Sequence, residues 1–405
     1  ARIYYGQRAS NISDSVQVVV YTAAIHPDNP EFACAKEKGI PMLTRAQLLG
    51  QIMRNYDTSI AVAGTHGKTT TTSMLSHILL KGECDPTISV GGILPAIGGN
   101  IRVGQSETFL TEACEYTNSF LSFFPTMGII LNIDADHLDF FKDIDDIRNS
   151  FHRFAQILPE DGYLIINGGI DRLDEITGDL PCHVITFGKD ASCDYSYTDV
   201  TFDDFGRGSY TLLKKGTPSV KVSLGVVGEH NILNSLSVFA LMDILGIDTN
   251  VVLKSLADFH GTDRRFEYKG TIGGVTILDD YAHHPTEITA TLKAAANYPH
   301  KTLWCVFQPH TYSRTNAFLK DFAKALTLAD KVILADIYAA REKNTIGITS
   351  KDLQAEVEKL GKECYYFHSF DEIENFLLKN CINGDLLITM GAGDVVKIGE
   401  NLLGI

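Results

Sequence analysis

The chain has no apolar run close to the roughly 18–20 residues that a membrane-spanning helix needs, so we expect no membrane insertion. It also has no pair of cysteines at the two-residue spacing of a zinc knuckle or a redox motif. Its eight cysteines are scattered over 405 residues, which is typical of reduced and mostly buried thiols. The cysteine pattern therefore predicts a cytoplasmic protein.

Positive charge is scarce as well. Lys and Arg number 35 against 50 Asp and Glu, and the formal net charge is −15. Because affinity for nucleic acid depends largely on clustered Lys and Arg, we expect no nucleic-acid partner. A single nucleotide is a different case, since a few backbone N–H groups and one lysine suffice to bind a triphosphate. With 44% hydrophobic and 21% charged residues, the chain is predicted to fold into two or three domains.

Strand-like runs alternate with helical patterns along most of the chain, which predicts a multidomain α/β architecture with mostly parallel sheets. The expected strands are Val16–Tyr21, Ser59–Ala63, Thr126–Ile133, Tyr163–Asn167 and His183–Phe187, then Val275–Leu278, Thr302–Phe307, Lys331–Ala335 and Leu386–Met390. Short alternating runs in residues 194–224 predict a small antiparallel patch. We expect three domains, at residues 1–54, 55–262 and 263–405.

The strongest local motif is the loop GTHGKTT, which lies between an expected strand and an expected helix. Backbone N–H groups at such a turn and helix start form a cradle for anions. Lys68 is placed to reach the terminal phosphates of a nucleotide, and Thr69 to offer its hydroxyl to Mg²⁺. The common phosphate loop has a glycine six residues before the lysine, where this chain has Val62. The motif still predicts nucleotide binding by Gly64, Thr65, His66, Gly67, Lys68, Thr69 and Thr70.

Acidic residues follow two further strand-like runs, in the segments TEACE at 111–115 and NIDADH at 132–137. The carboxyl ends of strands meet at one edge of an α/β sheet, where such folds bind their ligands. A carboxylate such as Glu112 and the imidazole of His137 suit a divalent cation that bridges a transferred phosphate and an attacking oxygen. An Asp-x-Asp-His loop alone more often only faces solvent. Because this one follows a phosphate loop, a metal site is the favoured interpretation.

Polar residues also mark the second half of the chain. His230 and Asn234 open an expected helix, where contacts to adenine and helix capping are equally good interpretations. The pair Arg264 and Arg265 offers bidentate contacts to phosphate, and Asp280 at a strand end suits ribose hydroxyls. Because similar loops follow several strands, we expect them to share one cleft.

These motifs, in this order, resemble those of the Mur ligases. The stretches that carry the resemblance are GTHGKTTT, EACEYTNSFL, NIDADHLD, GEHNILN, RRFE, DDYAHHPTEI and FQPHTYSRT. The resemblance implies a partial N-terminal Rossmann-like domain, a central P-loop ATPase domain and a C-terminal Rossmann-like domain. It implies ATP and Mg²⁺ as cofactors, and UDP-N-acetylmuramate and L-alanine as substrates that are joined through an acyl phosphate during peptidoglycan synthesis.

The resemblance also implies catalytic roles. Lys68 and Thr69 would bind the triphosphate and a first Mg²⁺, and Glu112 would lie near the γ-phosphate and help to place that ion. His137 would be a ligand of a second Mg²⁺.

Other roles concern the remaining ligands. By resemblance, His230 and Asn234 would face adenine, Arg265 the phosphates and Asp280 the ribose. His283 and Arg314 would meet the incoming amino acid and the phosphorylated intermediate, and residues 22–25 the UDP moiety.

Two features depart from the family pattern. The glycine-rich loop that opens the UDP-binding domain is missing from residues 1–54, and we therefore expect weak binding of UDP-N-acetylmuramate. Thr311 stands where some relatives have a second arginine. The alternatives are a sister ligase that adds a preformed tripeptide to the same sugar nucleotide in wall recycling, and a non-catalytic ATP-binding relative. A homodimer is left open.

Overall fold

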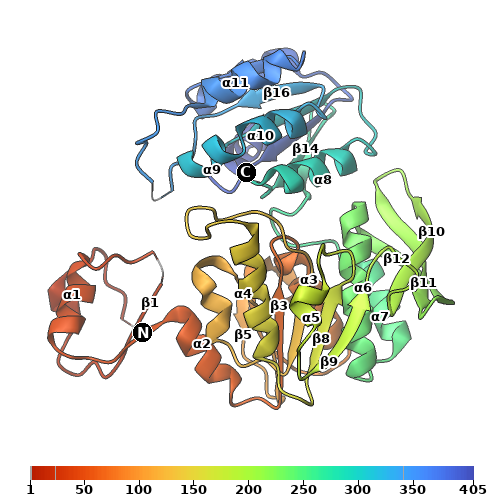
Figure 1. The fold of residues 1–405 in the computed structure, drawn as a ribbon. Coiled ribbons are helices and arrows are strands. Elements are labelled where there is room, and N and C mark those ends of the chain that lie inside the picture. The colour runs from red at the N-terminus through yellow and green to blue at the C-terminus, as the bar shows by residue number, and fades with distance from the viewer. Residues whose placement is uncertain (1, 23, 341) are drawn as a thin grey trace.

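The computed structural model describes residues 2–22, 24–340 and 342–405. The N-terminal segment lies at one side of the molecule (Figure 1) and contains η1 (Ala9–Asn11), β1 (Val19–Tyr21), α1 (Pro30–Glu37), β2 (Met42–Thr44) and α2 (Arg45–Met53). Strand β1 is shorter than the predicted run 16–21 and pairs in parallel with β2. Asn29 caps α1, whose first residue is a proline, as expected for a helix start. Of the predicted UDP contacts at 22–25, residue 23 lies outside the described residues.

A ten-stranded sheet forms the middle of the molecule, in the order β12-β11-β10-β9-β8-β7-β3-β6-β4-β5. Its strands are β3 (Thr58–Ala63), β4 (Thr87–Leu94), β5 (Gly99–Arg102), β6 (Thr108–Glu112), β7 (Met127–Ile130), β8 (Tyr163–Asn167), β9 (His183–Phe187), β10 (Tyr195–Phe202), β11 (Arg207–Lys214) and β12 (Thr217–Val227). The pairs β10–β11, β11–β12 and β4–β5 are antiparallel. The predicted antiparallel patch is therefore present, as a continuation of the parallel sheet through β9.

Helices cover both faces of this sheet: α3 (Lys68–Lys81), α4 (Ile144–Gln156), α5 (Asp174–Thr177), α6 (Glu229–Ile244) and α7 (Thr249–Asp258), with the short turns η2 (Pro95–Ile97) and η3 (Tyr116–Ser122). Alternate residues of a strand point to opposite faces. In β3, Ile60 and Val62 join the core under α3 and α6, whereas Ala61 and Ala63 join the core that contains α4. Because both faces of β3 are buried, the position of this strand is fixed, and so is the start of the loop that follows it.

The C-terminal sheet has the order β13-β14-β18-β15-β16-β17. Its strands are β13 (Glu267–Ile272), β14 (Val275–Asp280), β15 (Leu303–Phe307), β16 (Lys331–Leu334), β17 (Cys364–Tyr366) and β18 (Leu386–Met390). Only the pair β13–β14 is antiparallel among these described strands. The helices are α8 (Pro285–Ala295), α9 (Tyr312–Ala317), α10 (Leu319–Leu326), α11 (Ser350–Lys359), α12 (Phe370–Asn380) and α13 (Val396–Leu403).

The predicted α/β fold class is confirmed, and the main differences lie at element ends. The helix after the phosphate loop begins at Lys68, so the last residues of the motif form its first turn. Strand β7 ends at Ile130, before the predicted end at Ile133. The chain beyond it contacts the phosphate loop, where Oδ1 of Asn132 accepts the N–H of His66. The domain boundaries stay predictions; the one after residue 262 falls between α7 and β13.

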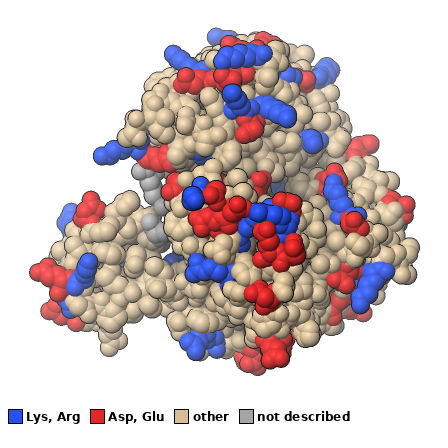
Figure 2. All heavy atoms as spheres, in the orientation of Figure 1, with Lys and Arg blue, Asp and Glu red and all other residues tan. Residues whose placement is uncertain are grey.

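The C-terminal part lies above the central sheet, with α8 and α9 turned toward it (Figure 1). On the face drawn in Figure 2, Lys and Arg side chains lie interspersed with Asp and Glu side chains. Among the described residues, no helix has both the length and the apolar character that a membrane crossing requires.

Candidate active site

The phosphate loop connects β3 to α3. Gly64 and Gly67 have φ angles of 139° and 85°, in the region that favours glycine. A side chain on Gly67 would also approach Asn234, since a Cβ there would lie 3.0 Å from its Oδ1 atom. Gly67 caps α3 without any side-chain hydrogen bond from the described residues. The first N–H groups of α3 are thus suited to bind an anion.

Lys68 is largely removed from water, with its side chain 15% exposed, and it has three hydrogen-bond partners. Its Nζ atom donates to the carbonyl oxygens of Gly64 (2.6 Å) and Thr65 (3.0 Å), and lies 2.9 Å from Oε2 of Glu115. Burial opposes the charge of the ammonium group, but the Glu115 carboxylate outweighs this effect, so the pKa of Lys68 is raised. Glu115, for which the sequence suggested no role, is the counter-ion of the loop lysine.

The predicted cation ligands form two groups around Glu115. The Thr69 hydroxyl donates to Oε2 of Glu112 (3.1 Å), whose Oε1 accepts the N–H of Gly91 (2.5 Å). The His137 ring instead faces Glu115, with 3.8 Å between Nε2 and Oε1. That buried Oε1 atom has no hydrogen bond from the described residues.

Oxygen atoms of a hydroxyl and of carboxylates are the ligands that Mg²⁺ prefers. Thr69 and Glu112 therefore suit Mg²⁺, and the unbonded oxygen of Glu115 adds a donor between them and His137. The residues present fit the predicted cation.

A cavity of about 410 Å³ lies beside the loop, between the central and C-terminal parts. It is lined by seven of the predicted nucleotide-binding residues, His66, Gly67, Thr70, His230, Asn234, Arg265 and Asp280. Thr65 faces elsewhere, because its hydroxyl accepts the N–H of Asp134 (2.9 Å). The Thr65 side chain therefore stabilises the loop after β7 and does not line the cavity.

Burial tunes the charges of this cavity. Desolvation at the cavity wall, with the nearby charges of Arg265 and His66, lowers the pKa of His230 to about 4, so a neutral ring is favoured near pH 7. Burial raises the pKa of Asp280 to about 6, although Asp280 accepts N–H bonds from Phe266 (2.8 Å) and Ala282 (2.7 Å). Arg265 lies over the Tyr281 ring, 5.3 Å from its centre.

Of the two arginines expected at the phosphates, Arg264 does not line the larger cavity. Its guanidinium group is 2.9 Å from Asp279 and also donates to the carbonyl oxygens of Gly391 and Gly393. These contacts tie the start of the C-terminal sheet to the loop after β18. Arg265 alone of the pair lines the cavity.

A second cavity, of about 380 Å³, lies between the segment 116–139 and the C-terminal part. It is lined by Tyr116, Asp136, His137, Leu138, Asp139, His310, Thr311, Ser313, Arg314, Ala317, Phe318, Ala340 and Glu342. Arg314 is held by Asp136 (2.9 Å) and His310 (3.1 Å). Thr311 has a φ of 64°, and its hydroxyl accepts the N–H of Arg314 (3.4 Å).

His283 lies near both cavities without lining either. Its Nδ1 atom is 3.0 Å from the carbonyl oxygen of Tyr281, and its ring centre is 5.7 Å from that of His310. Burial lowers the pKa of His283 to about 4, so the neutral ring donates its Nδ1–H to that carbonyl.

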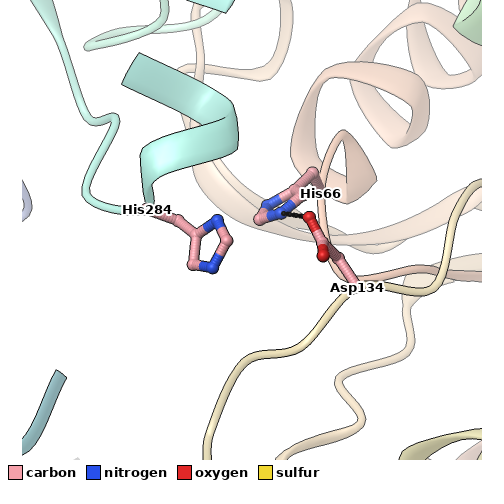
Figure 3. A group of neighbouring side chains, drawn as sticks. All are labelled: His66, Asp134 and His284. Carbon is pink, nitrogen blue, oxygen red and sulfur yellow. Dashed lines mark ion pairs between the residues drawn. The ribbon is translucent and has the colours of Figure 1, made fainter. Parts of the chain in front are cut away.

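Figure 3 shows a cluster between the two parts of the molecule that sequence reasoning missed. Nδ1 of His66 is 3.2 Å from Glu287 of α8, and Nε2 is 3.4 Å from Asp134. The ring of His284 lies beside it, with 4.8 Å between ring centres. No short motif signals such a pairing, because His66 and Glu287 are 221 residues apart.

His66, Asp134 and His284 are close enough together to suggest a cation site. Both nitrogens of His284 are engaged, however: Nε2 is 3.0 Å from the carbonyl oxygen of Ala135, and Nδ1 accepts the N–H of Thr286 as the cap of α8. Burial favours a neutral His66, but the two carboxylates outweigh it and raise its pKa to about 9. The cluster is therefore an ion pair around a charged His66.

Known proteins match the chain along its whole length. Residues 62–242 match the family model described as Mur ligase middle domain, residues 264–393 the one described as Mur ligase, glutamate ligase domain, and residues 1–57 the one described as Mur ligase family, catalytic domain. A UDP-N-acetylmuramate–L-alanine ligase of Agathobacter rectalis is 61% identical over 402 residues, which are 99% of this chain and 88% of that protein. The chain belongs to the Mur ligase family.

Solved structures agree with this assignment. The UDP-N-acetylmuramate–alanine ligase of Thermotoga maritima superposes on this Mur ligase with a TM-score of 0.83 and 29% identity, covering 98% of this chain and 87% of the other. A murein peptide ligase from Psychrobacter arcticus gives a TM-score of 0.72 at 22% identity, over 99% and 88% of the two chains, and supports the fold alone. The family predicted from the motifs is confirmed.

The charge on His66 of this Mur ligase has a consequence for stability. Its pKa of about 9 lies above the ordinary value of 6.5, so the charge stabilises the fold fully below pH 6.5, and this contribution is lost as the pH rises through about 9. His230 and His284 also face the ring, but their pKa values are lowered, so they stay neutral in this window.

We predict that the difference in Tm between the wild type and His66→Asn is largest near pH 6 and shrinks by about pH 10. Scanning calorimetry over this pH range measures it. A difference that does not change with pH would show that His66 carries no stabilising charge.

Proposed function

We propose that this Mur ligase joins L-alanine to the carboxylate of UDP-N-acetylmuramate, using ATP and an acyl-phosphate intermediate. The observation that carries the proposal is the set of contacts that links the phosphate loop to both cavities. Gly67 and Thr70 line the larger cavity, whereas Lys68 contacts Glu115, which neighbours His137 of the second cavity. A nucleotide in the first cavity would thus direct its phosphates toward a substrate in the second.

In the proposed reaction, the substrate carboxylate attacks the γ-phosphorus of ATP and ADP leaves. The amine of alanine then attacks the acyl carbon, a C–N bond forms, the C–O bond to phosphate breaks, and inorganic phosphate is released with a proton. The N–H groups of α3 and the ammonium group of Lys68 stabilise charge on the transferring group. No protein nucleophile is needed.

Mg²⁺ belongs to this proposal as a counter-charge for the phosphate oxygens when it is bound. Thr69 and Glu112 would hold a first ion, and His137 would help to hold a second. The buried Glu115 oxygen near His137 supports this assignment.

The larger cavity is proposed to take the nucleoside. Neutral His230 and Asn234 would face adenine, Asp280 would accept hydrogen bonds from ribose hydroxyls, and Arg265 would contact phosphates. We assign residues 55–262 to ATP binding, 263–405 to a domain that closes on it, and 1–54 to UDP binding.

The second cavity is proposed to take the reacting carboxylate and alanine. Arg314 would face the phosphorylated intermediate, since Asp136 and His310 hold its guanidinium group at the cavity wall. His283 would lie beside the amino acid. A cytoplasmic location is part of the proposal, because all eight cysteines are free.

The proposal predicts amino-acid-dependent release of phosphate from ATP. With Mg²⁺ and UDP-N-acetylmuramate present, we expect L-alanine to support turnover and other amino acids and a preformed tripeptide to support far less. Trapping with hydroxylamine would detect the acyl phosphate. Preferred turnover of the tripeptide would instead identify a recycling ligase, and no turnover with any acceptor would identify a non-catalytic relative.

Replacement of Lys68 tests the loop. Lys68→Ala removes charge stabilisation from the transferring phosphoryl group, and we expect turnover to fall by at least about a thousandfold with the fold intact. Phosphate release measures the loss, and circular dichroism checks the fold. Near-normal ligation by this variant would refute the role of the loop.

Replacement of His137 tests the second cation. His137→Ala should lower turnover and raise the Mg²⁺ concentration needed for half-maximal activity, because a ligand of the bridging ion is removed. A Mg²⁺ titration of phosphate release measures the shift, and manganese binding followed by electron paramagnetic resonance gives a readout independent of turnover. Unchanged metal dependence would eliminate His137 as a ligand.

A further inference from the structure

The first turn of α8 and its cap make three polar contacts with the phosphate-loop region of the central part. Glu287 reaches His66 (3.2 Å), the Thr286 hydroxyl donates to Oδ2 of Asp134 (2.7 Å), and His284 reaches the carbonyl oxygen of Ala135 (3.0 Å). All three contacts join α8 or its cap to the phosphate loop or to the loop that follows β7. This end of α8 therefore contributes directly to how the two parts meet, together with the pair that Arg314 of α9 makes with Asp136.

The charge on Glu287 is favoured by its place in α8. It stands in the first turn, where the positive end of the helix dipole stabilises a carboxylate. Its second oxygen accepts the N–H of His283 (3.1 Å), which fixes its orientation. The side chains of Glu287 and His66 are each only 14% exposed, so water screens their attraction poorly.

The pair also lies at the wall of the proposed nucleotide cavity. His66 precedes Gly67 in the phosphate loop, and both residues line the cavity together with Glu287. Arg265 and Asp280, from the C-terminal part, line it too. A change in how α8 meets the loop would consequently move Arg265 and Asp280 relative to the phosphates.

We propose that Glu287 and His66 are positioning residues, which lock the C-terminal part against the phosphate loop so that both parts surround the nucleotide. Asp134 pairs with Nε2 on the other side of the His66 ring, and this contact keeps Nδ1 of the ring oriented toward Glu287. The inference rests on the proposed function, because it assumes that the larger cavity takes ATP. It concerns closure alone and does not depend on which amino acid is joined.

The test compares nucleotide binding and closure in matched variants. Glu287→Gln keeps the size of the side chain and removes its charge. A lower population of the closed state reduces apparent affinity in proportion, and we expect the Kd for a non-hydrolysable ATP analogue with Mg²⁺ to rise about tenfold, within the usual range of coupling between sites. Small-angle X-ray scattering should show less compaction of this variant by the analogue than of the wild type.

A second variant and a control separate a lock from a general loss of stability. His66→Asn should show a similar loss, and the double variant should be no worse than Glu287→Gln, because the two residues act through one contact. Glu400→Gln is the matched control. Glu400 pairs with Lys269 (3.0 Å) in the same part of the chain, away from the loop, and this variant should bind like the wild type.

Wild-type affinity and compaction in Glu287→Gln would overturn the inference, as would losses that multiply in the double variant. If Glu287→Gln does not fold, His66→Asn decides by the same two measurements. Binding is measured without alanine or sugar nucleotide, so a wild type that binds the analogue and fails to ligate alanine would count against the proposed function alone.

Discussion

A buried positive charge needs a partner, and the geometry of this site depends on how Lys68 is paired. Its ammonium group is placed by two carbonyl oxygens of its own loop and by Glu115. An unpaired ammonium at this depth would be costly. The pairing draws η3 and the end of β6 against the loop, and it brings Glu115 next to His137. The phosphate loop, the acidic segment 111–115 and the second cavity are thus linked through the contacts of Glu115 with Lys68 and His137.

The same principle operates between the two α/β parts. His66 and Glu287 are charged groups whose side chains are each only 14% exposed, so leaving either one unpaired would be costly, and the more exposed Asp134 adds a second partner for His66. Arg314 and Asp136 make a second such pair across the boundary, with side chains 10% and 8% exposed. Apolar packing would allow many orientations of similar energy, whereas directional pairs favour one. This specificity suits an enzyme whose ligands contact both parts.

Sequence reasoning located the loop, the acids and the strand ends, because these depend on local patterns. Gly64, Gly67 and Lys68 lie within a few residues, and the hydrophobic run of β3 predicts where they start. Sequence reasoning did not find that Glu115 pairs with Lys68 or that Glu287 pairs with His66, because each pairing depends on how segments distant in the sequence pack together. Arg264 illustrates the same limit. It is identical to Arg265 in type and adjacent in sequence, yet a buried Asp279 holds it within the C-terminal sheet.

Charge balance gives an independent reason to include cations in the proposed mechanism. The region around the phosphate loop contains five carboxylates, those of Glu112, Glu115, Asp134, Asp136 and Glu287. Three positive groups of this region already have acidic partners: Lys68 pairs with Glu115, His66 with Glu287, and Arg314 with Asp136. Arg265, which lies over the Tyr281 ring, is left to face the cavity. A triphosphate adds several negative charges, more than Lys68, Arg265 and the helix start together neutralise. Divalent ions at Thr69, Glu112 and His137 would supply the missing positive charge, and they would do so beside the phosphates.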